Sequence, residues 1–506
     1  MNSPAGKEVL SARRVVVART SAVDGWGTPP YHPPPGFPER RGRAAGDNRL
    51  YAAVRQVLAG LQLDADRCGR EEWNPFRALV SPGASVVIKP NLVRHRHGRG
   101  GWLATVVTDP RLTRAVLDFA VDAVAPGGTV TLADSPLQSC DFEALSRSLA
   151  LREMTRAAAH SGVQVRILDF RREEVTKGDH GLITGRRPLS GDPSGYVAID
   201  LGACSALRSL ESSRGRFRVT QYAPEETTDH HDGARHEYLI PRSLLAADLV
   251  INLPKIKTHR KAGMTGALKN LVGINGSKAW LPHHRAGAVT EGGDEYQRPS
   301  LRKRCMSRIW ERMDRTSSLW SRRLLGRVES FIRRTGRLVP FPDPYFEGSW
   351  WGNMTMPAMV ADLNRIFVYA DAEGRMSERP VRRQLVIADA VIAGEGEGPL
   401  EPSPRSLGAL IGGGNPVAVD WVAAAMMGLD PRRIPVLTRC VERDARPLLP
   451  VAPEETRVFQ AGAAGVSRER SLEQVAAAVV QPFVPAAGWK GHIEASPASL
   501  DAAGRS

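Results

Sequence analysis

Short apolar runs alternate with segments of helical periodicity along most of the chain, which is the pattern of an α/β protein. The runs that match buried strands are 14–18, 85–90, 129–134, 163–170, 196–201, 238–241, 249–254, 384–394 and 406–414. Helical periodicity covers 48–61, 109–125, 142–161, 355–369 and 416–428. Strand, helix and strand follow one another between 85 and 134, which is the order of a βαβ unit with parallel strands. We therefore predict an α/β fold of mainly parallel sheets flanked by helices, in two lobes with a cleft, plus a basic helical insertion.

The chain has 506 residues, more than a single domain usually contains, so several parts are expected. The predicted parts are an N-terminal strand, Pro-rich arm and helix (1–80), a first α/β lobe with a histidine-rich segment (81–300), a basic helical insertion (301–345), a second α/β passage (346–482) and a flexible tail (483–506). The two α/β passages belong either to one sheet or to two lobes.

Cysteine usage and hydropathy indicate where the protein acts. Five scattered cysteines with no CxxC pair argue against a disulfide scaffold, a zinc ribbon or a ferredoxin-type cluster built from this chain alone. Residues 1–25 show no charged-then-apolar leader, and the apolar stretch 407–429 is interrupted by Asn415, Pro416 and Asp420. We expect a cytoplasmic protein without a transmembrane segment.

The formal charge of +15 is concentrated in one segment. Residues 301–337 contain twelve Lys and Arg against three acids, and their apolar residues recur at helical spacing. One or two amphipathic basic helices are predicted there. They either form a solvated insertion that covers the core, or contact an anionic substrate, a membrane surface or nucleic acid through Arg302–Arg337.

Polar residues follow several predicted strands at the point where each strand ends. Because ligands of open parallel sheets bind outside the carboxyl ends of the strands, these residues are candidates for one common site. They are Lys89, Asn91, Asp134, Ser135, Asp389 and Asn415. Structural roles are the alternative, since Asp134 with Ser135 also suits a turn, and Asn415 also suits a helix cap. In the expected loop GEGEGP, Glu395 and Glu397 either bind a cation or sugar hydroxyls or are solvated.

The densest group of candidate chemistry lies in 249–285, where an apolar strand is followed by lysines, histidines and glycines. Buried lysine or histidine must find a partner or change its charge, so a site is favoured over a solvated face. Lys269, on a helix that opens near Thr265, is expected to be partly buried with a lowered pKa that makes it a base or an attachment point. The predicted catalytic residues are Lys89, Asp134, Lys255, Lys257, His259 and Lys269, and Asn270 is a further substrate-binding candidate.

Histidines are the candidate metal ligands. Six of the twelve lie between His230 and His284, and imidazole suits divalent transition metals. The predicted ligands are His230, His231, His236, His283 and His284. No HExxH signature is present, so acid/base chemistry without metal and structural roles stay open.

Several separate motifs resemble the domain of unknown function 362 family. They are VVIKPNLV, TDPRLTRAVLDF, TLADSP, INLPKIKTH, TGALKNLVGI, DLNRIFVYADAEGRM, IADAVIAGEGEGPL and GNPVAVDWVAAAMMGLDP, which together cover about 85–431. The family has no established general reaction. Many members carry cysteine-rich cluster-binding segments, which this chain lacks.

The stretch from Lys255 to His284 is also faintly similar to the lactate racemase family, whose pattern is a histidine, a glycine-rich turn, a lysine that holds a nickel-pincer cofactor, and a later histidine ligand. This similarity implies proton transfer by His259, a cofactor on Lys269, and a metal ligand at His283 or His284.

The sequence thus predicts an enzyme that acts on an anionic or polyhydroxylated small molecule by redox or isomerisation chemistry, with a divalent transition metal as the candidate cofactor. No nucleophile elbow or P-loop is present to support hydrolysis. The alternatives are a non-catalytic module whose arginine-rich helices bind nucleic acid, anionic lipid or polymer, and an electron-transfer protein that uses a partner's cluster.

Overall fold

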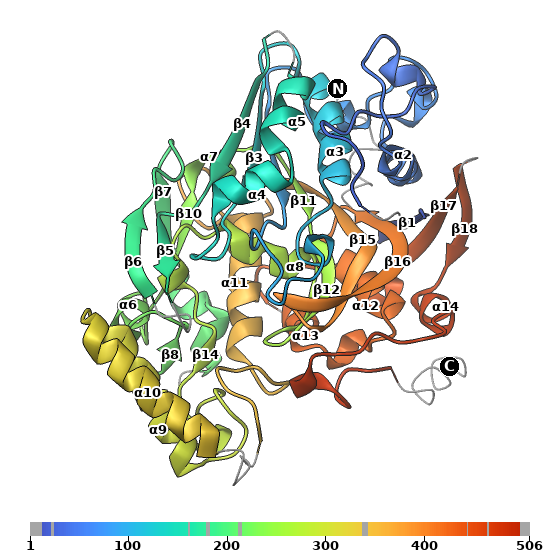
Figure 1. Ribbon diagram of the computed structural model, residues 1–506. Coiled ribbons are helices and arrows are strands. Elements are labelled where there is room, and N and C mark those ends of the chain that lie inside the picture. The colour runs from blue at the N-terminus through green and yellow to red at the C-terminus, as the bar shows by residue number, and fades with distance from the viewer. Residues whose placement is uncertain are drawn as a thin grey trace.

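The computed structural model describes residues 13–21, 25–159, 162–178, 183–210, 215–335, 343–442, 444–462 and 465–495. A large sheet of eleven strands runs through the molecule, with helices on both faces (Figure 1). Alternate residues of its central strands enter two separate cores: Val250 joins one, whereas Leu249 and Ile251 join the other. The predicted α/β fold with a mainly parallel sheet is therefore confirmed.

One half of the sheet is parallel. Its strands are β15 (Arg383–Glu397), β11 (Leu249–Leu253), β2 (Ser85–Pro90), β3 (Thr129–Asp134) and β4 (Gln164–Asp169), in that order. Strands β2 and β3 are joined through α3 (Pro110–Val124), which Asp109 caps by accepting a hydrogen bond from Arg111 N. The predicted βαβ unit is confirmed.

The other half of the sheet is mostly antiparallel. It comprises β16 (Glu401–Gly413), β1 (Arg14–Arg19), β17 (Arg457–Gly462) and β18 (Gly465–Arg470), beside β15. Strands of both α/β passages thus share one sheet. The helices that pack on the sheet include α2 (Leu50–Gly60) and α12 (Pro416–Met426), and α11 (Thr355–Tyr369) packs against α13 (Pro435–Val441). The division of the chain into lobes stays a prediction.

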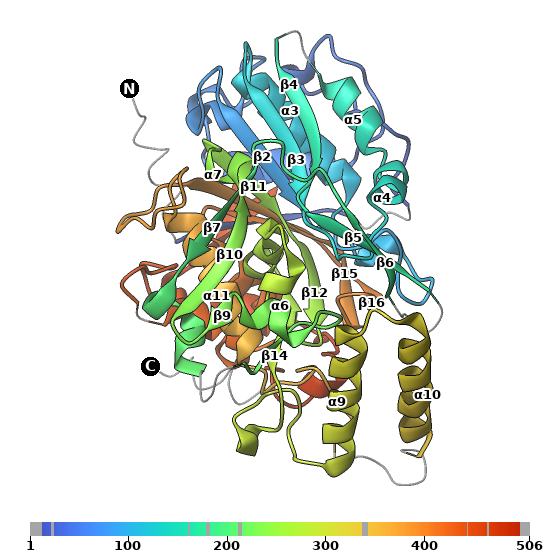
Figure 2. The ribbon, with the colours of Figure 1, turned by 90° about the vertical axis from the view of Figure 1, so that its left-hand side faces the viewer.

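Smaller elements surround the sheet. The strands are β5 (Glu173–Lys177), β6 (Ile183–Pro188), β7 (Tyr196–Asp200), β8 (Phe217–Arg218), β9 (His231–Asp232), β10 (Arg235–Pro241) and β14 (His284–Arg285). The helices are α6 (Pro224–Thr228), α7 (Arg242–Leu245), α13 (Pro435–Val441) and α14 (Leu472–Ala477). The basic insertion forms α9 (Leu301–Arg315) and α10 (Leu319–Thr335), which lie side by side and project from the body (Figures 1 and 2). No helix in the described ranges is long and apolar enough to cross a membrane.

Three elements differ from the sequence prediction. The helix expected over 142–161 is two helices, α4 (Phe142–Ser148) and α5 (Leu151–Ala158), because Ala150 between them has a φ of 51°. The GEGEGP segment is not a free loop, since Glu395–Glu397 continue β15 and pair with β16. A new strand, β12 (Lys255–His259), follows β11 after Pro254 and pairs with β15 and with β13 (Gly263–Thr265).

The C-terminal segment, expected to be flexible, is packed on the body as far as Ala495. Trp489 and Ile493 are fully buried, and Trp489 Nε1 donates to Arg260 O at 2.7 Å. Burial of a large aromatic side chain outweighs the Ala, Gly and Pro content that suggested disorder. Residues 496–506 lie outside the described residues.

Replacing Trp489 should therefore destabilise the whole protein. We expect Trp489→Ala to lower the free energy of unfolding by about 3–5 kcal/mol, because a buried indole is lost and a cavity remains. Chemical denaturation followed by circular dichroism measures the change. Trp102→Ala is the matched control, since Trp102 is 51% exposed and its loss should change stability little. Equal stability of the two variants would contradict the packing described.

Candidate functional site

The exits of β2 and β3 meet in a buried ion pair. Lys89 Nζ lies 2.7 Å from Asp134 Oδ1, and both side chains are buried. The other carboxylate oxygen of Asp134 accepts a hydrogen bond from Leu92 N at 2.7 Å. Gly273 approaches this pair so closely that a Cβ there would lie 2.1 Å from Asp134 Oδ1. A glycine is needed because any side chain would displace the carboxylate.

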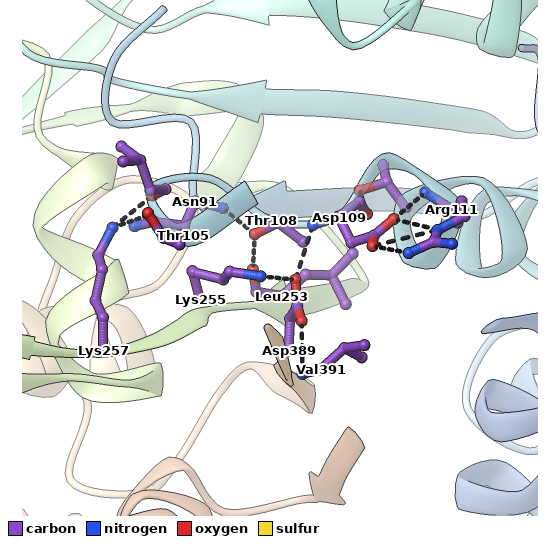
Figure 3. A network of polar contacts seen from close by, with 12 residues as sticks. Asn91, Thr105, Thr108, Asp109, Arg111, Leu253, Lys255, Lys257, Asp389 and Val391 are labelled. Atoms are coloured by element: carbon purple, nitrogen blue, oxygen red, sulfur yellow. Dashed lines mark hydrogen bonds and ion pairs between the residues drawn. The ribbon is translucent and has the colours of Figure 1, made fainter. Parts of the chain in front are cut away.

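Two asparagines connect this pair to Lys257. Asn270 Oδ1 accepts hydrogen bonds from Lys89 Nζ at 3.2 Å and from Asn91 Nδ2 at 2.9 Å. Asn91 Oδ1 accepts in turn from Lys257 Nζ at 3.1 Å, as Figure 3 shows. The structure therefore brings five of the predicted site residues into one hydrogen-bonded network.

Lys255 is held by a second buried carboxylate. Its Nζ lies 2.8 Å from Asp389 Oδ2, which also accepts a hydrogen bond from Asp109 N at 2.8 Å (Figure 3). Asp389 Oδ1 accepts from Val391 N at 3.1 Å. Asp389 thus joins β12, β15 and the start of α3.

Two further lysines of the group were not predicted. Lys261 Nζ donates to Thr220 Oγ1 at 3.2 Å, and Lys278 Nζ donates to Ser135 O at 2.7 Å. The signal that could have identified them is composition: the chain contains ten lysines among 69 basic residues. Six of the ten form this group, which we call the lysine cluster: Lys89, Lys255, Lys257, Lys261, Lys269 and Lys278.

Lys269 differs from the rest of the lysine cluster. The other five ammonium groups each have a protein partner, whereas Lys269 has no hydrogen bond or ion pair with any residue that the structure describes. It lies on the short helix α8 (Ala267–Asn270). Asp420 fixes the start of this helix by accepting hydrogen bonds from Ala267 N at 2.6 Å and Leu268 N at 2.9 Å. Lys269 is therefore held by a rigid backbone while its amine is available.

Burial, together with repulsion from neighbouring cations, lowers the pKa values of four lysines of the cluster: Lys257, Lys261, Lys269 and Lys278. Burial, followed by repulsion from Lys89 and Lys261, lowers the pKa of Lys269 to about 8. Burial is also the main cause that lowers the pKa of Lys261 to about 8 and that of Lys278 to about 7. The pKa of Lys257 lies well below its ordinary value, first through burial and then through Lys255 and Lys269. Lys261, Lys269 and Lys278 therefore lose their protons within or near the physiological pH range.

His259 stands in the same electrostatic environment. Its Nδ1 accepts the backbone N–H of Lys261 at 3.0 Å, so the proton of the neutral imidazole is carried on Nε2. Burial, then repulsion from Lys269 and Lys257, holds the pKa of His259 well below its ordinary value. His259 is therefore a neutral hydrogen-bond donor at Nε2.

Three predicted binding residues make contacts that hold the fold, and their predicted role in binding stays a prediction. Glu395 Oε2 accepts from Val484 N at 3.0 Å and Glu397 Oε1 accepts from Ala487 N at 2.7 Å, so both glutamates hold the C-terminal segment. Asn415 caps α12 by accepting from Val417 N at 2.9 Å. Ser135, by contrast, stays at the cluster: its carbonyl binds Lys278, and its Oγ donates to Asn275 O at 2.9 Å.

The five histidines predicted as metal ligands do not form one centre. His231 Nε2 is bonded to Trp280 O at 3.0 Å, and His230 Nδ1 to Glu237 Oε2 at 2.9 Å. His283 Nδ1 is bonded to Leu281 O, whereas the buried His284 Nδ1 has no hydrogen-bond partner among the described residues. In the described part of the chain, no three His, Cys, Asp or Glu residues are grouped so that they could hold a metal ion. The donor set therefore does not fit the predicted metal.

A groove of 1460 Å³ lies beside the cluster, between α10 and the body. Arginines of α10, Arg260 and Thr220 line it, and Thr220 is the partner of Lys261. The wall of the groove thus contacts the lysine cluster. Its positive charge favours the approach of anions.

Residues 185–425 match the family described as Domain of unknown function (DUF362). The match confirms the resemblance for that part of the chain. It includes every cluster lysine from Lys255 to Lys278 and begins after Lys89 and Asp134. The faint similarity to lactate racemase stays a prediction.

A relative from Synechocystis sp. named as a thylakoid-associated protein is 24% identical over 260 residues, which are 50% of this chain and 55% of the relative. The chain thus spans little more than half the length of that relative. A crystal structure of a Thermotoga maritima protein aligns over 71% of this chain and 55% of that chain, at 12% identity and a TM-score of 0.29. A likeness this small indicates nothing about function.

Removal of Asp389 should reveal the cost of leaving Lys255 unpaired. We expect Asp389→Ala to lower the free energy of unfolding by about 3–5 kcal/mol, because the remaining ammonium is buried without its carboxylate. Urea denaturation measures the loss. Glu143→Ala is the control, since the Glu143–Arg152 pair is more than half exposed and should contribute less than about 1 kcal/mol. An Asp389→Ala protein as stable as the wild type would show that Lys255 needs no partner.

Proposed function

We propose that this protein is an enzyme that binds a small anionic molecule at the lysine cluster and isomerises it by proton transfer, with Lys269 as the base. The observation that carries the proposal is that Lys269, alone among the six cluster lysines, has no partner in the described part of the protein. Lys269 is half-buried, and an amine that lies among other cations without a partner of its own is typical of a functional site.

The expected ligand is an anion because the cluster has more cations than carboxylates. Asp134 and Asp389 each pair with one lysine, while Lys257, Lys261 and Lys278 are bonded to neutral oxygens. A carboxylate or phosphate placed among these amines would offset their repulsion. The groove that reaches Thr220 supplies a basic approach to the cluster.

The proposed chemistry follows from two groups that make no hydrogen bond within the described part of the protein: the amine of Lys269 and the Nε2–H of His259. An amine with a pKa of about 8 is a competent base near neutral pH, and here it would take a proton from the carbon next to the ligand's carboxylate. The electron pair left behind moves onto the carboxylate oxygens, to which the Nε2–H of His259 can donate. Return of a proton to the opposite face of the same carbon inverts its configuration and completes an isomerisation, whereas return to the same face only exchanges the hydrogen.

Isomerisation is favoured over the redox chemistry that the sequence also predicted, because the available group is a base and not a redox-active group. Since the histidines do not form a ligand set, no step is assigned to a metal. We keep the cytoplasm as the proposed location, which the five free cysteines support. The name of the Synechocystis relative suggests association with a membrane as the alternative.

Two substitutions distinguish the role of Lys269 as a base from the role of its positive charge in binding. Lys269→Met should abolish both binding of anions and exchange of substrate hydrogen, whereas Lys269→Arg should keep binding and lose exchange by about a hundredfold or more, since arginine stays protonated. Deuterium incorporation from heavy water into a panel of hydroxy and keto acids, read by mass spectrometry, measures exchange. Stabilisation against heat by sulfate measures binding.

Lys490→Met, which changes an exposed lysine, is the matched control for Lys269→Met and should behave as the wild type. Full exchange activity in Lys269→Arg would contradict the assignment of the base. A wild-type protein that binds sulfate through Lys269 but exchanges no acid of the panel would favour the non-catalytic binding module.

Anion affinity should fall as pH rises. Lys278, with a pKa of about 7, and Lys261 and Lys269, with pKa values of about 8, are protonated below these values and lose their positive charge above them. Calorimetric titration with sulfate, whose charge is constant, should therefore show weaker binding at about pH 9 than at about pH 6. Lys278→Gln should weaken binding at low pH and flatten the profile near pH 7. A profile without slope in the wild type would contradict the lowered pKa values.

A further inference from the structure

The helical insertion carries a row of exposed apolar side chains on its outer helix, α10. Trp320, Leu324, Val328 and Phe331 are 72%, 47%, 41% and 69% exposed. Their spacing places them on one face, within an arc of roughly 80° at 3.6 residues per turn. Aromatic and aliphatic side chains this large are rarely exposed in a row unless something covers them. We call this row the apolar ridge of α10.

Three arginines lie directly beside the apolar ridge. Arg323, Arg327 and Arg334 follow the same helical spacing, next to Trp320, Leu324 and Phe331, and are exposed. None of the three has a hydrogen bond or ion pair with a residue in the described ranges, whereas the neighbouring Arg333 is paired with Glu329. Together with Phe331 they also line the groove between α10 and the body. All three arginines are exposed there, so their guanidinium groups are accessible to an external anion.

The rest of the insertion holds α10 in a fixed position. Helix α9 is anchored by the buried Lys303, which donates to Tyr345 O at 3.1 Å, and by the Arg218–Glu311 ion pair at 2.7 Å. Helix α10 packs against α9, and Arg322 donates to Thr316 O at 2.7 Å. Figure 2 shows both helices projecting side by side from the body. The apolar ridge is thus held on a helix that α9 anchors, with Trp320, Leu324 and Val328 outside the groove and Phe331 at it.

From this arrangement we infer that α10 binds the surface of an anionic lipid bilayer, with the apolar ridge in the acyl boundary and Arg323, Arg327 and Arg334 on the lipid phosphates. Interfacial helices combine an apolar face that contains Trp and Phe with basic residues beside it, as α10 does. The helix lies in the plane of the surface, because five arginines in seventeen residues prevent it from spanning. The inference does not depend on the proposed reaction.

A bilayer would contact both the apolar ridge and the arginines beside it, whereas nucleic acid or a second copy of the chain would suit only one of the two. Nucleic acid would bind the arginines through its phosphates but would leave the four apolar side chains in water. A second copy of this chain would cover the apolar ridge but would bring the same arginines together, which repel one another. Anionic lipid supplies negative charge and apolar material side by side.

Flotation with vesicles tests the inference on the full chain. The protein should bind vesicles that contain phosphatidylglycerol and phosphatidylcholine, and bind vesicles of phosphatidylcholine alone much less. Trp320→Ser with Phe331→Ser should weaken binding by about tenfold or more, because most of the inserted apolar surface is lost. Arg323→Gln and Arg327→Gln should each weaken binding by roughly fivefold and reduce the preference for phosphatidylglycerol.

The matched control is Trp102→Ser with Val480→Ser, which removes two exposed apolar side chains elsewhere and should leave binding unchanged. Circular dichroism checks that each variant is folded, and quenching of tryptophan fluorescence by brominated lipid, reduced in Trp320→Ser, gives a second measurement. Vesicle binding that survives Trp320→Ser with Phe331→Ser would overturn the inference. So would a protein that binds duplex DNA through the arginines and not vesicles, or a wild-type dimer that Trp320→Ser with Phe331→Ser converts to a monomer.

Discussion

Repulsion between buried amines is the constraint on which the candidate site depends. Transferring an ammonium group from water into the interior costs several kcal/mol even after relaxation. The protein offsets this cost with a carboxylate for Lys89 and for Lys255, and with neutral oxygens for Lys257, Lys261 and Lys278. These partners come from β3, from β15 and from the loops after β2, β3 and β8, so these segments must come together before the cluster can form.

The backbone around the lysine cluster is also closely fixed. Gly273 allows the backbone to approach Asp134 where no other residue would fit, and Asp420 fixes α8 through two backbone N–H groups. Burial raises the pKa of Asp420 to about 7, although both hydrogen bonds oppose the rise. Its folded-state pKa thus lies above the ordinary value, so this carboxyl favours folding most when protonated. Asp420 therefore places Lys269 without adding a full negative charge beside it.

The sequence could predict where polar residues converge, because the carboxyl ends of parallel strands share one edge. Lys89, Asn91, Asp134, Lys257 and Asn270 do meet there. It could not predict which lysines are paired, since that depends on the register of β12 against β15 beyond Pro254. The contacts of Glu395 and Glu397 could not be predicted for a similar reason. Their strand continues past the site, so their side chains reach the C-terminal segment. Histidines close in sequence were separated because they belong to different small sheets, His231 and His236 to one and His284 to another.

The chain also distributes its two basic residue types in a way that distinguishes its two basic regions. Most of its basic residues are arginine, yet six of its ten lysines gather at the cluster, while α10 contains five arginines and no lysine. Arginine keeps its charge at any physiological pH and is weakly hydrated, which suits a surface that must hold phosphate continuously. Lysine is compact and changes its pKa readily when buried, which suits a site where an amine must both attract an anion and give up a proton. A cluster of arginines at the sheet edge could bind an anion but could not act as a base. The preference for lysine at that edge therefore supports the proposed proton transfer, and the preference for arginine on α10 supports the inferred binding to anionic lipid.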